Sequence, residues 1–125
     1  MTNKTKGQIE ADISVAITQF EKDHLGRGPK DSRTFIIQDM VLIRLKGVLT
    51  PAEEKLAKEE GGAQLIKQVR MRLIEGSRPL LEQIIQEKTG AKVTTIHTDI
   101  STHTGERIFV FGLNRNLEDE LENRS

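Results

Sequence analysis

Apolar side chains recur at every third or fourth position between residues 7 and 24, as expected on one side of a helix. Gly26 and Pro29 follow, and both residues favour the end of a helix. The pattern therefore predicts a helix over residues 7–24 that packs through one apolar stripe. That stripe comprises Ile9, Ile13, Ala16, Ile17, Phe20 and His24.

A run rich in β-branched and large apolar residues comes next and predicts extended structure. Gln38 and Asp39 divide this run into two strands, over residues 33–37 and 40–46. A second pair of strands is predicted over residues 92–101 and 106–113. Between them, the dipeptide Thr104-Gly105 supplies the positive φ that a tight hairpin requires.

The stretch TPAEEKLAKEEGG carries the clearest local signal for a helix start. Thr50 is suited to the N-cap, Pro51 to the first helical position, and Glu53 completes a capping box. We expect a short helix there that ends or bends at the two glycines, residues 61–62.

A longer helix is predicted over residues 63–89, with Gly90 as its cap. Gly76 and Pro79 interrupt the pattern, so we expect a kink or a break within residues 76–79. The apolar side of this helix is expected to consist of Leu65, Val69, Leu73, Leu80, Ile84 and Ile85.

These elements predict an α+β fold, a two-layer sandwich in which a four-stranded antiparallel sheet has helices on one face. The expected order is α-β-β-α-α-β-β, which contains two similar α-β-β units. Residues 1–118 are expected to form a single domain, and residues 119–125 a polar C-terminal tail.

The last predicted strand is apolar on both faces, because Phe109 and Phe111 alternate with Ile108 and Val110. One face packs against the helices, and the other needs a cover. A symmetric partner is the simplest cover, so we expect a homodimer assembled through the remaining sheet surface.

The composition removes several classes of function. The chain has no cysteine, which excludes disulfides, thiolate metal sites and cysteine nucleophiles. Lys plus Arg equals Asp plus Glu at 19 each, and Phe is the sole aromatic residue type, so a nucleic-acid partner is not expected. No apolar run is long enough to span a membrane, so we expect a cytoplasmic protein without a membrane partner.

Two of the three histidines lie near the second hairpin, in the stretch IHTDISTHTGERIFVF. His97, Asp99 and Ser101 alternate along the predicted strand and therefore share one face with Val93 and Thr95. The other face carries Thr94, Ile96, Thr98 and Ile100, and its isoleucines indicate the core side. The polar face is the first candidate for a ligand site.

The loop GRGPK at residues 26–30 is the second candidate. Arg27, Lys30 and the nearby Arg33 can present positive charge to an anion, although the segment lacks the phosphate-loop motif and also fits a simple helix stop. This loop and the strand of His97 follow equivalent helices in the two α-β-β units. They can therefore meet in one site for an anion or nucleotide.

Two alternatives use other residues. His97, Asp99 and His103 could serve a metal-binding protein or an enzyme. A straight strand separates the two histidines by about 20 Å, so that a shared metal ion would need a bulge or a second subunit. Arg70, Arg72 and Arg78 could bind RNA, although a solvated helix face is the better explanation of these residues. No set of residues forms a catalytic constellation, so a non-enzymatic function is favoured.

The stretches GVLTPAE and HTDISTHTGERIFVF resemble a family of short, freestanding bacterial proteins catalogued as a domain of unknown function. The resemblance extends over about residues 6–118 and implies a single-domain bacterial protein, with no catalytic residues or cofactor to transfer. Together, the residues and the resemblance favour a homodimeric regulatory or interaction module that senses an anion or nucleotide or binds a protein partner.

Overall fold

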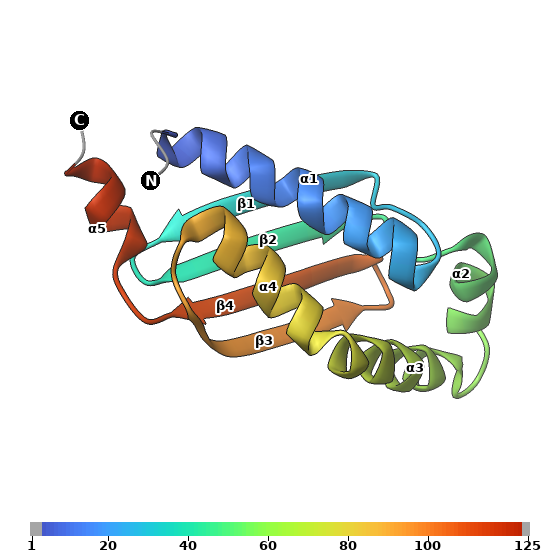
Figure 1. The fold of residues 1–125 in the computed structure, drawn as a ribbon. Helices are drawn as coiled ribbons and strands as arrows, with labels where there is room; N and C mark the ends of the chain where they lie inside the picture. Colours follow the sequence, from blue (N-terminus) through green and yellow to red (C-terminus); the bar gives the residue numbers. More distant parts are fainter. Residues whose placement is uncertain (1–3, 124–125) are drawn as a thin grey trace.

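The computed structural model describes residues 4–123, which form five helices and one four-stranded antiparallel sheet (Figure 1). The elements are, in chain order, α1 (Lys6–Leu25), β1 (Asp31–Ile37), β2 (Met40–Lys46), α2 (Pro51–Ala57), α3 (Gly62–Gly76), α4 (Arg78–Thr89), β3 (Val93–Ser101), β4 (Glu106–Leu113) and α5 (Leu117–Glu122). The predicted α+β class is confirmed.

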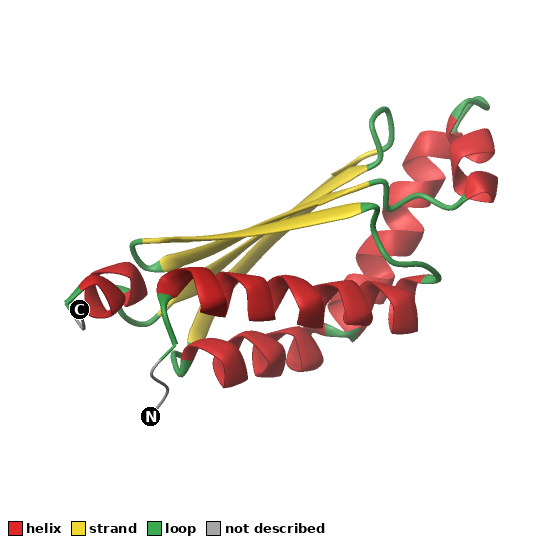
Figure 2. Ribbon diagram, turned by 90° about the horizontal axis from the view of Figure 1, so that it is seen from above, coloured by secondary structure: helices red, strands yellow, loops and turns green. Residues whose placement is uncertain are grey.

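The sheet has the strand order β1-β2-β4-β3, so its two hairpins meet along β2 and β4. Helices α1 and α4 lie on one face of the sheet, and the other face is left without a helix (Figure 2). Helices α2 and α3 extend beyond one end of the sheet. The two units α1-β1-β2 and α4-β3-β4 have the same order of elements, as the sequence predicted.

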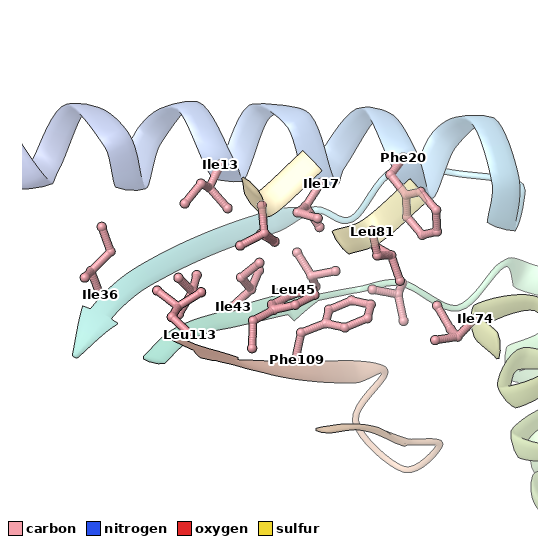
Figure 3. Close-up of a cluster of buried hydrophobic side chains, with 14 of the residues drawn as sticks. Ile13, Ile17, Phe20, Ile36, Ile43, Leu45, Ile74, Leu81, Phe109 and Leu113 are labelled. Atoms are coloured by element: carbon pink, nitrogen blue, oxygen red, sulfur yellow. The ribbon is translucent and has the colours of Figure 1, made fainter. Parts of the chain in front are cut away.

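The core lies between the sheet and the helices, because alternate residues of each strand point to that side. In β4 the residues Phe109, Phe111 and Leu113 are buried there, and α1 contributes the buried stripe of Ile9, Ile13, Ile17 and Phe20 (Figure 3). Fully burying a side chain of this size contributes about 1.5–3 kcal/mol to folding. This layer of side chains fixes how α1 lies on the sheet.

Capping bonds define the helix starts that the sequence indicated. In α2, the Thr50 hydroxyl accepts from the Glu53 amide, and the Glu53 side chain accepts from the Thr50 amide. Helix α1 has the same reciprocal pair between Thr5 and Gln8, and it ends at Gly26, whose φ of 98° few other residues adopt. The predicted bounds of the first helix and the predicted start of α2 are therefore confirmed within two residues.

The predicted long helix is broken, as expected near residues 76–79. Helix α3 ends at Gly76 and α4 begins at Arg78, with Pro79 in its first turn. The predicted apolar side of α3 is wrong, because Leu65, Val69 and Leu73 are about half exposed. The neighbouring row of Ile66, Arg70 and Ile74 faces the protein instead.

Two further predictions need correction. A bulge between Val93 and Thr95 shifts the register of β3, so Val93 pairs with Leu113 and packs against the core instead of sharing the face of His97. Residues 117–122, partly assigned to a polar tail, form α5, in which Leu117 and Leu121 are buried. The apolar side chains of this short helix anchor it, and the tail residues 124–125 lie outside the described residues.

Candidate functional site

Among residues 4–123, three charged side chains are buried: Glu21 of α1, Arg70 of α3 and Arg107 of β4. Each is at most 2% exposed. Burying a charge is costly unless it is paired and hydrogen-bonded, so the bonding of each group is informative.

Arg70 is the best satisfied of the three. Its Nε and Nη2 donate to the two carboxylate oxygens of Glu53 at 2.8 and 2.6 Å, and Nη2 also donates to the Val48 carbonyl at 3.0 Å. Burial acts to raise the pKa of Glu53, but the bonds from Arg70 and Thr50 outweigh it and lower that pKa. Glu53 therefore has two roles: it completes the capping box of α2, and it binds Arg70 of α3.

Arg107 lies on the core face of β4, in line with Phe109 and Phe111. Its guanidinium carbon sits 5.5 Å from the centre of the Phe109 ring, and its Nη1 donates to the Thr98 hydroxyl at 2.8 Å. Its buried Nε has no hydrogen-bond partner among residues 4–123. Burial lowers the pKa of Arg107, which stays a cation near neutral pH.

Glu21 faces both arginines without a hydrogen bond to either. Neither of its carboxylate oxygens has a partner among the described residues. Burial raises the pKa of Glu21 to about 7, against the opposing attraction of Arg107 and Arg70. The carboxyl group is thus close to half protonated at neutral pH, and it neutralises the two arginines only in part.

A cavity of about 380 Å³ opens beside Arg107, between α3, the start of α4 and the strands β3 and β4. Its apolar lining includes Met71, Ile74, Leu81, Ile96 and Ile100, and its charged lining includes Lys67, Glu75, Arg78, Asp99 and Arg107. Lys67 pairs with Asp99 at 3.3 Å, and Arg78 pairs with Glu82 at 3.1 Å. Among residues 4–123, Arg107 is therefore the buried cation of this lining, and no carboxylate forms a salt bridge with it.

The predicted ligand residues do not converge in one place. His97 and Asp99 line the cavity described above, whereas Lys30 and His103 line a second cavity of about 630 Å³ near the β3–β4 turn. Arg27 donates to the Leu49 carbonyl at 3.3 Å. The loop of residues 26–30 thus approaches the turn after β3, not the strand segment of His97.

The other two predicted ligand residues are used locally or left open to solvent. Ser101 accepts from the Thr104 amide within the turn at 3.2 Å, and Arg33 is exposed with Asp31 3.7 Å away. Within residues 4–123, no group of three or more His, Asp or Glu side chains is placed to hold a metal ion. The RNA alternative loses Arg70, because that side chain is buried and bonded to Glu53 rather than solvated.

The sheet face opposite the helices carries the second feature of interest. Cross-strand pairing aligns its side chains in rows: Phe35, Leu42, Val110 and His97 form one row, and Arg33, Arg44, Ile108 and Asp99 form the next. Phe35, Ile37 and Met40 are 36–43% exposed on this face. Arg33 and Asp99 lie on the edge strands of this face, and the salt bridge between Arg44 and Glu106 joins the two central strands. An exposed apolar surface with charged side chains beside it is typical of a contact surface.

The hydrophobic pattern of the sequence did not predict that these three charged residues are buried. Glu21 and Arg70 occupy positions next to apolar stripes, and Arg107 occupies a core position of the alternating pattern in β4. A charge in register with Phe109 and Phe111 is the signal that could have identified Arg107, since charged residues are seldom fully buried without a purpose.

No helix in the described part of the chain is both long and apolar enough to cross a membrane. No solved structure matches the chain. Among curated proteins, the uncharacterized protein YbcI of Bacillus subtilis is 49% identical over 119 residues, which cover 95% of this chain and 96% of YbcI. The uncharacterized protein YrhF of the same organism is 26% identical over 108 residues, covering 85% and 88% of the two chains.

A family model, described as "Na+-translocating membrane potential-generating system (MpsC)", matches residues 5–115. The match runs from the cap of α1 to the end of the sheet, so it includes Glu21, Arg70, Arg107 and the open sheet face. The chain belongs to the MpsC family.

Proposed function

We propose that the protein is a non-enzymatic interaction module that works as a homodimer, assembled through the open face of its sheet. The observation that carries this proposal is the apolar surface of that face, formed by Phe35, Ile37, Met40, Leu42, Ile108 and Val110. Two such sheets pack face to face with their strands aligned to within about 30°, which buries both surfaces together.

The charges at the two edges of the sheet select one arrangement. A two-fold axis that runs along the strands, between β2 and β4, places β1 of one subunit against β3 of the other. Because Arg33 and Asp99 belong to the same row, each Arg33 then meets the partner's Asp99. Leu42 and Val110 lie next to the axis, so each Leu42 faces the partner's Val110.

The dimer is tested by sedimentation equilibrium at micromolar concentration. The wild-type protein should sediment with twice the mass of one chain. Leu42→Glu places a charge beside the proposed axis and should give a monomer with an unchanged far-UV circular dichroism spectrum. Val15→Glu is the matched control, because Val15 is 71% exposed on α1, away from the sheet face, and this variant should remain a dimer. A monomeric wild-type protein would refute the proposal.

We further propose that the dimer is a regulatory component of the Na+-translocating system after which the family is described. The supporting observation is a second unpartnered surface, the exposed stripe of Leu65, Val69 and Leu73 on α3, which suits a protein partner. Cells that lack the protein should generate a smaller Na+-dependent membrane potential, measured with a potential-sensitive dye. The wild-type gene should restore that potential and Val69→Glu should not, whereas an unchanged potential in the deletion strain would refute this role.

A further inference from the structure

We infer that the cavity beside Arg107 binds a small organic carboxylate with an apolar body, whose carboxylate pairs with the buried guanidinium. The cavity, of about 380 Å³, falls in the size range of sites for small molecules. This inference goes beyond the proposed dimer. The two proposals share Asp99, but the anchor Arg107 lies on the buried face of the sheet, opposite the dimer surface, so the cavity does not require the dimer.

Arg107 supplies the anchor for the carboxylate. The side chain is 2% exposed, lines the cavity, and keeps a buried Nε without a hydrogen-bond partner among residues 4–123. Its Nη1 is held by the Thr98 hydroxyl, which itself donates to the Ile108 carbonyl at 2.8 Å. The guanidinium is therefore fixed in orientation before a ligand arrives, which lowers the entropic cost of binding.

The charged lining of the cavity consists of three cations, Lys67, Arg78 and Arg107, and two carboxylates, Glu75 and Asp99. Lys67 and Arg78 also line the cavity but already have acidic partners, Asp99 and Glu82. Glu21, behind Arg107, is kept partly neutral near pH 7 by its burial. The carboxylate of a ligand would therefore neutralise the positive charge of Arg107, which Glu21 neutralises only in part.

The apolar residues that line the cavity determine which group can be attached to the carboxylate of the ligand. Met71, Ile74, Leu81, Ile96 and Ile100 present apolar surface to the cavity. Inorganic phosphate or sulfate would leave that surface in contact with water, whereas an aliphatic or aromatic body would cover it. A carboxylate of about six to eight carbon atoms combines both requirements.

Hexanoate is the probe for the first experiment, with hexylammonium and inorganic phosphate as controls for charge and for the apolar body. The backbone amide signals of residues 96–100 should shift saturably in nitrogen–proton correlation spectra as hexanoate is added. Hexylammonium and phosphate should leave these signals in place. The proposal is overturned if hexanoate at about 10 mM, a concentration high enough to detect weak specific binding, causes no saturable shift of these signals. It is also overturned if phosphate alone causes the same shift.

Two variants test the anchor and the cavity separately. Arg107→Met keeps the length of the side chain and removes its charge, and it should weaken hexanoate binding at least about tenfold, since a charge-assisted hydrogen bond is lost. Met71→Glu places a negative charge at a position that is 57% exposed, so the fold should survive, and it should weaken binding by a similar factor.

Gln68→Glu is the matched control for Met71→Glu. Gln68 is exposed on the same helix and does not line the cavity, so hexanoate should bind this variant within about twofold of the wild-type affinity. If Met71→Glu and Gln68→Glu bind hexanoate equally well, the ligand lies elsewhere and the proposal fails, whatever the behaviour of Arg107→Met.

Discussion

Replacing Glu21 by Gln should stabilise the protein at high pH and have a much smaller effect at low pH. Gln has nearly the shape of a protonated Glu, so the variant imitates the neutral form of the buried side chain. Glu21 is completely inaccessible to solvent, and its carboxylate oxygens have no hydrogen-bond donor among residues 4–123. Its ionised form is therefore poorly solvated in the folded state.

The magnitude follows from the pKa of Glu21, which burial raises from its ordinary value of 4.5 to about 7. A difference of this size corresponds to about 3 kcal/mol, at about 1.4 kcal/mol for each pH unit. Because the folded state holds its proton more tightly than the unfolded state, the stability contribution is complete below pH 4.5. It is then lost as the pH rises towards 7.

Urea unfolding of both proteins at pH 5 and at pH 8 measures the effect, because all other titrating groups are common to both. The free energy of unfolding of Glu21→Gln minus that of the wild type should increase by about 2–3 kcal/mol between the two pH values. Glu60→Gln, an exposed control at the turn after α2, should follow the wild type throughout. If the difference in the free energy of unfolding between Glu21→Gln and the wild type does not change with pH, then Glu21 has the same pKa in the folded and unfolded states, and the reasoning is refuted.

Four further substitutions test the packing around the site, each by urea unfolding. Arg70→Ala should cost about 1.5–3 kcal/mol, because it removes the charged hydrogen bonds to Glu53, whose side chain is 24% exposed and remains partly solvated. Thr50→Ala should cost about 1 kcal/mol through loss of the α2 cap. Gly62→Ala should cost more than about 2 kcal/mol, because a Cβ there would lie 1.8 Å from the Leu56 carbonyl oxygen. Gly76→Ala, where a Cβ meets nothing within 4 Å, should be neutral or stabilising by up to about 1 kcal/mol.

Local signals in the sequence were sufficient for most of the fold. The capping box at Thr50 and Glu53, the left-handed glycine after α1 and the alternation in β4 each act over a few residues, so they can be recognised without knowledge of tertiary contacts. The open apolar sheet face was also predictable, because Ile108 and Val110 alternate with two buried phenylalanines.

Long-range contacts account for what the sequence did not predict. Whether α3 buries the row of Leu65 or the row of Ile66 depends on a salt bridge between Arg70 and Glu53, which are 17 residues apart. The burial of Arg107 likewise depends on Phe109 and Thr98 around it. Periodicity assigns charged residues to solvent, so it cannot identify a site that is built on buried charges.

The proposed dimer pairs Arg33 with the partner's Asp99, and an exchange of these two charges tests that pairing. Arg33→Asp alone, or Asp99→Arg alone, places like charges together at two points of the dimer and should weaken it about tenfold. In an equal mixture of the two variants, a heterodimer has opposite charges at both points. Native mass spectrometry of that mixture should therefore show mainly heterodimer, and a statistical mixture of dimers, or monomers alone, would contradict the proposed arrangement.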